Sequence, residues 1–172
     1  LGRYHLERLV QGGLAPGEPA AALRTAMTHL EDAVERAPGW AAAHAQLALA
    51  YHWLASITPA EEEALYPRSK ASALRAIDLN PAEARAHASL GFVRFFFEHD
   101  WDGAEQAYRR ALELDPNSHH ADYAIYLRTA GRYQEAVTHF RLAEERNPLS
   151  RFLKRQVAEA CFSAGRDDEA IA

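Results

Sequence analysis

The sequence predicts an all-α fold in which antiparallel pairs of helices repeat along the chain. The first observation is recurrence, since four similar phrases, such as "ALRAIDLNP" and "YRRALELDP", each end in a proline: Pro38, Pro81, Pro116 and Pro148. The second is spacing, because small and large apolar residues stand three and four positions apart before each proline, which marks one stripe of a helix. The third is that another helical phrase, such as "ARAHASLGFVRFFF", follows each proline.

The helix before each proline carries an alanine ladder. Most repeats read small, apolar, small along one stripe, with the members Ala26, Leu30 and Ala33, then Ser69, Ala73 and Ala76, then Ala104, Tyr108 and Ala111, then Ala136, Phe140 and Ala143. The proline ends each such helix, because it disfavours the α conformation at the residue before it.

The helix after each proline carries an apolar residue followed by a small one. These pairs are Leu47 and Ala48, Leu90 and Gly91, Tyr123 and Ala124, and Val157 and Ala158. The small member allows two helices to approach closely, so the repeating unit is expected to be a packed helix pair.

Two segments depart from the pattern. In the first repeat, "VQGGLAPGEPAA" (residues 10–21) predicts a loop from its Gly and Pro content. In the long second repeat, Thr58, Pro59 and Glu61 predict a helix start with a capping box. Pro67 then predicts a break or kink.

Together these residues resemble the tetratricopeptide repeat (TPR), a helix–turn–helix unit with small residues at fixed positions. The resemblance covers residues 22–172 and implies a right-handed α-solenoid, a tetratricopeptide-like superhelix forming one domain over residues 1–172. The expected repeats are 1–38, 39–81, 82–116, 117–148 and 149–172, with the last one truncated. The chain is expected to be a fragment of a longer protein. Phrases such as "GRYHLERL" and "GRYQEAV" are similar to TPR regions of bacterial regulators linked to winged-helix, adenylate cyclase or Ser/Thr kinase domains.

Composition narrows the function classes. The chain has 172 residues, 48% of them hydrophobic, and a net charge of −5 without a run of like charges, so nucleic acid is not expected as a partner of this segment. No apolar run is long enough to cross a bilayer, so no membrane is expected as a partner either. A single cysteine, Cys161, gives no disulfide framework and favours a cytoplasmic location.

Motifs for catalysis and for cofactors are missing. The sequence lacks G-x-S-x-G, G-x-G-x-x-G and the P-loop, so no enzyme and no cofactor is expected. Cys161 is expected to fill space in the core rather than to react. No two histidines stand three or four residues apart, and no metal site is expected. His44, His87 and His120 occupy one repeated slot, which indicates packing.

The stretch "FVRFFFEHDW" (residues 92–101) concentrates aromatic residues. Leu90, Val93 and Phe97 form one stripe and are expected to lie at the helix seam. Phe92, Phe95, Phe96 and His99 lean towards the side that lines the concave surface in TPR proteins. Two alternatives stay open: the rings line an open groove, or the long segment 56–70 covers them. Trp101 begins the next helix, with Asp102 and Glu105 spaced as a capping box, and is expected to pack between helices.

The leading hypothesis is a non-catalytic scaffold that binds a protein, a peptide or another domain of its parent protein. The expected groove residues are aromatic or charged, a composition typical of interface hot spots: His52, Trp53, Arg85, Phe92, Phe95, Phe96, Arg128, Arg155, Glu159 and Phe162. The alternative is a self-association module, because a repeat stack without a polar cap at its end tends to associate.

Overall fold

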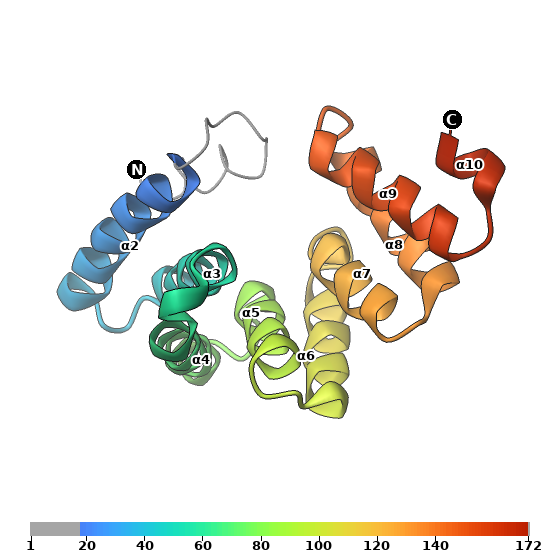
Figure 1. Ribbon diagram of the computed structural model, residues 1–172. Coiled ribbons are helices and arrows are strands. Elements are labelled where there is room, and N and C mark those ends of the chain that lie inside the picture. The colour runs from blue at the N-terminus through green and yellow to red at the C-terminus, as the bar shows by residue number, and fades with distance from the viewer. Residues whose placement is uncertain (1–17, 172) are drawn as a thin grey trace.

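The computed structural model describes residues 18–171, and within that range every regular element is a helix (Figure 1). The elements are α2 (Glu18–Arg36), α3 (Ala41–Ile57), the 3₁₀ helix η1 (Pro59–Glu61), α4 (Glu62–Leu79), α5 (Ala84–Phe96), α6 (Trp101–Leu114), α7 (His120–Thr129), α8 (Tyr133–Arg146), α9 (Arg151–Ser163) and α10 (Asp167–Ile171). The predicted all-α solenoid of helix pairs is confirmed.

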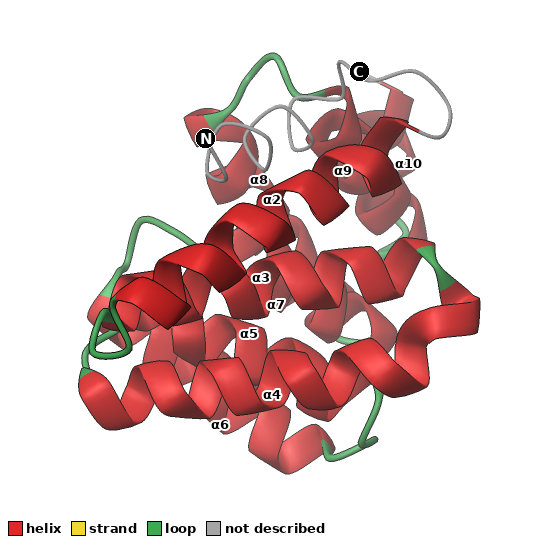
Figure 2. Ribbon diagram, turned by 90° about the vertical axis from the view of Figure 1, so that its left-hand side faces the viewer, coloured by secondary structure: helices red, strands yellow, loops and turns green. Residues whose placement is uncertain are grey.

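The helices follow one another along an open arc (Figure 1). After α2, the pairs are α3 with α4, α5 with α6, α7 with α8 and α9 with α10, and the four predicted prolines lie in turns between these pairs. On the inner side of the arc α3 packs on α5, and α5 on α7, while α4 and α6 lie on the outer side. Figure 2 shows the same helices from the side, stacked in layers.

Alanine forms the seam between neighbouring pairs, as the ladder predicts. Ala45 of α3, Ala76 of α4 and Ala86 of α5 meet in one fully buried cluster. Because these side chains are a single methyl group, three helix backbones can approach one another there. Within repeat 3, a Cβ added to Gly91 would lie 3.1 Å from the Tyr108 ring, so a side chain at this position would crowd the contact between α5 and α6.

Large side chains fill the spaces between the alanines. Tyr108 and Phe140, which take the large position of the ladder in repeats 3 and 4, are among the largest fully buried side chains. Burying a side chain of this size stabilises the fold by roughly 1.5–3 kcal/mol. In repeat 2 the ladder has serine instead of alanine at one position, and Ser69 Oγ donates a 2.8 Å hydrogen bond to the carbonyl of Ala48.

The capping residues differ from the prediction. Asp100, not Asp102, caps α6, accepting a 2.9 Å hydrogen bond from the backbone N–H of Gly103. The expected box at Thr58 is also wrong, although a helix does start at Pro59. The Thr58 hydroxyl points back and donates to the carbonyl of Leu54, at 2.6 Å, and it accepts no hydrogen bond from the following turn.

Two predicted interruptions are helical in the structure. α4 runs unbroken through Pro67, so the predicted break does not occur. Pro67 removes a hydrogen bond to the carbonyl four residues earlier, at Glu63, which is exposed in the first turn of α4 where water can replace the lost donor. Of the loop predicted over residues 10–21, residues 18–21 form the start of α2, and the remainder lies outside the described residues.

The turn into α7 is tighter than its counterparts. His44 and His87 stand six residues after their proline, whereas His120 stands four residues after Pro116. His119 closes this shorter turn in the left-handed conformation, with φ of 64°. The tighter turn still places the His120 ring in the slot that His44 and His87 occupy.

Candidate functional site

The ten predicted groove residues all lie on α3, α5, α7 and α9, which are the first helices of the four described pairs. His52 and Trp53 come from α3, and Arg85, Phe92, Phe95 and Phe96 from α5; Arg128 comes from α7, and Arg155, Glu159 and Phe162 come from α9. Their role in partner binding stays a prediction, but the surroundings of eight of them define two groups, while Arg85 lies near Asp122 and His119 and Phe162 stands alone near the end of α9.

The first group is an aromatic cluster formed by His52, Trp53, Phe92, Phe95 and Phe96. The Phe92 ring stacks on His52, with centroids 4.2 Å apart, and on Phe96 at 4.4 Å. His52, Phe92 and Phe95 are buried, whereas Phe96 stays 42% exposed. Most of this cluster therefore belongs to the core that joins repeats 2 and 3.

Rings from three other helices surround the aromatic cluster. The Tyr66 ring of α4 lies 6.3 Å from the Phe92 ring, measured between centroids. Tyr66 is the aromatic residue by which segment 56–70 contacts the aromatic cluster in the described part of the chain. Trp101 of α6 and Tyr126 of α7 pack edge-on against Phe95, at 5.0 and 5.6 Å. Trp101 thus packs between helices, as predicted. Phe97 lies beside Tyr66 at the seam, also as predicted.

His52 is unusual within this cluster because neither ring nitrogen has a hydrogen-bond partner. Its ring is 1% exposed. Burial lowers the pKa of His52 to about 3, since a charged imidazole would lose its hydration without gaining a counter-charge. The residue is therefore neutral and acts as a flat packing ring.

The second group is a charged cluster formed by Arg128, Arg155, Gln156 and Glu159. Arg128 of α7 reaches across to α9 and donates to Glu159 Oε2 at 2.6 Å, while Arg155 donates to Glu159 Oε1 at 2.7 Å. Gln156 adds a hydrogen bond of 3.1 Å to Oε2. Both oxygens of the carboxylate are thus occupied, and the two guanidinium groups are held side by side.

The charged cluster keeps contact with solvent. The Arg155 side chain is 60% exposed, and Phe162, two turns of α9 beyond it, is 73% exposed. Burial alone would raise the pKa of Glu159, but the hydrogen bonds from Arg128 and Arg155 outweigh it and lower the pKa. With one carboxylate between two arginines, this cluster carries a net positive charge and retains free N–H donors.

Asp122 of α7 is a further polar residue that the groove prediction missed. Burial raises the pKa of Asp122 to about 6, and the nearby Arg85 opposes this only in part. Burial, together with Arg85, lowers the pKa of the neighbouring His119 to about 4. Asp122 and Ser89 each stand two residues after the slot histidine of their repeat, and this shared position is the sequence signal that marks a polar residue there.

The repeated histidines are structural. In each of three repeats the ring Nε2 lies within hydrogen-bonding distance of the carbonyl of the proline that ends the preceding helix. The distances are 3.1 Å for His44 and Pro38, 3.0 Å for His87 and Pro81, and 3.0 Å for His120 and Pro116. This confirms the packing prediction. Over residues 18–171, no group of three or more His, Cys, Asp or Glu side chains could hold a metal ion.

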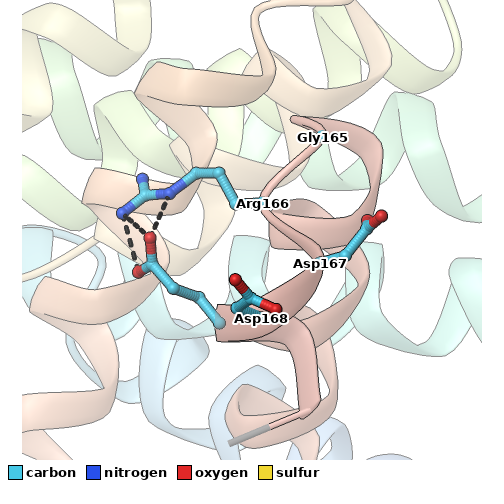
Figure 3. Close-up of a pocket in the computed structure, with 5 residues that line it drawn as sticks. Gly165, Arg166, Asp167 and Asp168 are labelled. Atoms are coloured by element: carbon cyan, nitrogen blue, oxygen red, sulfur yellow. Dashed lines mark hydrogen bonds and ion pairs between the residues drawn. The ribbon is translucent and has the colours of Figure 1, made fainter.

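The remaining candidates offer little chemistry. Cys161 is fully buried and fills space in the core, as predicted. A shallow pocket lies at the turn from α9 to α10, lined by residues 165–169 (Figure 3). In that pocket Arg166 donates two hydrogen bonds of 2.7 Å to Glu169, while Asp167 points away from this pair. These contacts hold the first turn of α10 in place.

Known structures share this architecture. A TPR protein from Thermus thermophilus superimposes with a TM-score of 0.67 over 84% of this chain and 78% of its own length, at 22% sequence identity. The described chain has the tetratricopeptide repeat fold. PilF of Pseudomonas aeruginosa gives a TM-score of 0.63 at 22% identity, and the match spans 76% of this chain but only 56% of PilF.

A third similar structure is YrrB, a TPR protein with an unusual peptide-binding site, at a TM-score of 0.55 and 19% identity over 87% of this chain and 73% of YrrB. At these identities the likeness is one of TPR fold alone. No family model matches the sequence, and no curated protein matches it at a significant level. None of the described helices of this TPR array combines the length and the apolar character needed to cross a membrane.

Proposed function

We propose that this chain is a non-catalytic scaffold for protein–protein interaction, and that the open part of its binding surface is the charged cluster with Phe162. The observation that carries the proposal is that Glu159 holds the guanidinium groups of Arg128 and Arg155 together while the Arg155 side chain stays 60% exposed. Phe162, two turns further along α9, is 73% exposed, and exposed arginine and aromatic side chains are typical of interface hot spots. YrrB, which shares the fold, has a peptide-binding site, and this supports a peptide or protein as the ligand.

We further propose that this TPR array is part of a larger bacterial regulator. There it would bind another domain or a partner protein and so control an output domain. The similarity of "GRYHLERL" and "GRYQEAV" to such regions supports this setting. A cytoplasmic location goes with it, because the single thiol, Cys161, requires no oxidising compartment.

A selection from a library of displayed random peptides tests the binding surface. Peptides that bind the wild-type chain should lose at least about tenfold in affinity, equivalent to ~1.4 kcal/mol, with the double variant Phe162→Ser, Arg155→Ser. The matched control is Arg110→Ser, which removes an exposed arginine of α6 that is paired only with Glu113, and it should leave binding unchanged. Selected peptides whose affinity falls equally with both variants would contradict the proposed surface.

Self-association is a second candidate, and the exposed apolar side chains of α9 and its preceding turn favour it. Leu149 is 87% exposed and Phe162 is 73% exposed. In earlier repeats the residue equivalent to Phe162 is covered by the next first helix, as His52 is by Phe92 and Arg128 by Glu159. Light scattering over a concentration series should show a dimer that Phe162→Ser abolishes. A monomer at all concentrations would exclude this candidate.

A further inference from the structure

Two histidines face each other across the helix pair of repeat 4. His120, in the first turn of α7, and His139, in α8, place their Nδ1 atoms 2.9 Å apart, with ring centroids separated by 5.1 Å. Repeats 2 and 3 also have the slot histidine, but the positions that correspond to His139 in their ladders hold Ser72 and Ala107. The imidazole pair is therefore a feature of repeat 4 alone among these three repeats.

The hydrogen bonds assign a tautomer to each ring. His120 Nε2 lies 3.0 Å from the carbonyl of Pro116, which can only accept, so Nε2 of His120 carries the hydrogen. In the neutral ring, Nδ1 of His120 is then an acceptor. The short contact with His139 requires that Nδ1 of His139 carries a hydrogen and donates it to His120. Nε2 of His139 is left as the free basic nitrogen of the pair.

The surroundings of the pair disfavour additional charge. Both rings are half-buried, and the Tyr123 ring packs edge-on against His139 at 4.9 Å. Burial, together with the charge of His120, lowers the pKa of His139, and Glu135, one turn earlier on α8, opposes this only in part. Arg132, the residue just before α8, also acts against a proton on His139, and no described group of α9 is among the charges that act on it. On the other side of His120 stands His119, whose own pKa is lowered to about 4.

We propose that the contact between His120 and His139 is an acid-sensitive latch between α7 and α8, which holds one added proton and opens when it takes up a second. The first proton binds Nε2 of His139, and the hydrogen bond from Nδ1 of His139 to Nδ1 of His120 persists with a charged donor. The second proton can bind only Nδ1 of His120. Two N–H groups and two positive charges then face each other, and the rings must separate.

Two contacts connect the latch to the charged cluster, so that opening the latch would disturb that cluster. Arg128 stands on α7, two turns after His120, and it binds Glu159 of α9. α8, which carries His139, packs directly against α9. A change in the spacing of α7 and α8 would therefore move Arg128 relative to Glu159, while α3 to α6 keep their packing because their slot histidines, His44 and His87, face no second imidazole.

Hydrogen exchange as a function of pH tests the latch. Protection factors, corrected for the intrinsic exchange rate at each pH, are compared at about pH 7 and about pH 4. These two values lie above and below the ordinary pKa of a histidine side chain. In the wild-type chain we expect protection in α7 and the first half of α8 to fall at acidic pH by more than tenfold relative to α5 and α6. His139→Ala, which installs the residue that repeat 3 carries, should remove this selective loss. Equal loss in wild type and variant, or loss spread evenly over all repeats, would overturn the proposal.

A second measurement requires no variant. Imidazole ¹⁵N signals of the wild-type chain should show Nε2–H on His120 and Nδ1–H on His139 at neutral pH, and the pair should take up its two protons in two separated steps. His87, which makes the same contact with a proline carbonyl but has no facing histidine, is the internal reference. Uptake of both protons by the pair in a single step, or the opposite tautomer on either ring, would contradict the latch.

Discussion

The first helices of repeats 2 and 3 and those of repeats 4 and 5 use the inner side of the arc in opposite ways. In repeats 2 and 3 the aromatic cluster packs onto itself, and Phe92 is only 3% exposed. In repeats 4 and 5 the charged cluster is arranged around Glu159, and Phe162 is 73% exposed. The same register of the same repeat therefore yields core in one half and accessible surface in the other. In the closed half each ring is covered from the next first helix, as Phe92 covers His52 and Tyr126 covers Phe95, whereas no first helix follows α9 among the described residues.

The largest expected contrast is between two phenylalanines that helical register places on the inner side of the arc, Phe92 and Phe162. Phe92→Ala should lower the free energy of unfolding by about 3–5 kcal/mol, because it leaves a cavity between the rings of His52 and Phe96. Phe162→Ala should change it by less than about 0.5 kcal/mol. Chemical denaturation followed by circular dichroism measures both, and similar losses for the two variants would show that the halves do not differ.

A second variant examines the alanine seam that both halves share. Ala111→Trp should destabilise the chain by about 1–3 kcal/mol or more, since Ala111 is fully buried in the ladder of α6 and the added ring would overpack it. Gln106→Trp, at an exposed position of the same helix, is the control and should be nearly neutral in thermal melting. Near-wild-type melting of Ala111→Trp would mean that the helix register is wrong.

The packed half contains a residue whose replacement should raise stability. His52→Leu should stabilise by about 1 kcal/mol at neutral pH, because it removes two buried ring nitrogens without partners. The gain should grow as the pH falls below 6.5, the ordinary histidine pKa, because His52 then binds a proton in the unfolded chain but not in the folded one until about pH 3. Exposed His29→Leu is the control, and a gain that is independent of pH would contradict the burial of His52.

Loss of an ion pair in the open half should have a small effect on stability. Arg128→Gln should cost at most about 1 kcal/mol, because it breaks one partly exposed ion pair with Glu159. The cost should shrink further at high salt, as expected for charges near solvent. Denaturation midpoints at two salt concentrations measure this, and a loss as large as that for Phe92→Ala would place the charged cluster in the core.

Much of the fold could be predicted from the sequence, because its determinants repeat. The alanine ladder and the prolines recur four times, so one misread repeat could not change the helix-pair reading. The residue that caps each helix was harder to predict. Asp100 stands just before α6 and Asp102 lies in its first turn, and only the three-dimensional structure shows that the Asp100 carboxylate reaches the N–H of Gly103. The sequence predicts a break or kink at Pro67 because it does not show that Glu63, whose carbonyl loses its donor, is exposed.

The site was harder to predict than the fold. Helical register places Phe92, Phe95 and Arg128 on the inner side, but it cannot show how deeply each is covered. Coverage depends on pairs between repeats, such as His52 with Phe92 and Arg128 with Glu159, which join residues far apart in the sequence. The pairing of His120 with His139 is hidden in the sequence for the same reason, since the two residues are 19 positions apart and lie on different helices.

The most direct measurement of the divided inner surface is hydroxyl-radical footprinting of the native chain, read by mass spectrometry at single residues. If repeats 2 and 3 are closed and repeats 4 and 5 are open, Phe162 should be oxidised rapidly, while Phe92 and Phe95 should react many times more slowly. Comparable oxidation rates at Phe92, Phe95 and Phe162 would contradict the account, since all three would then lie on one continuous open groove.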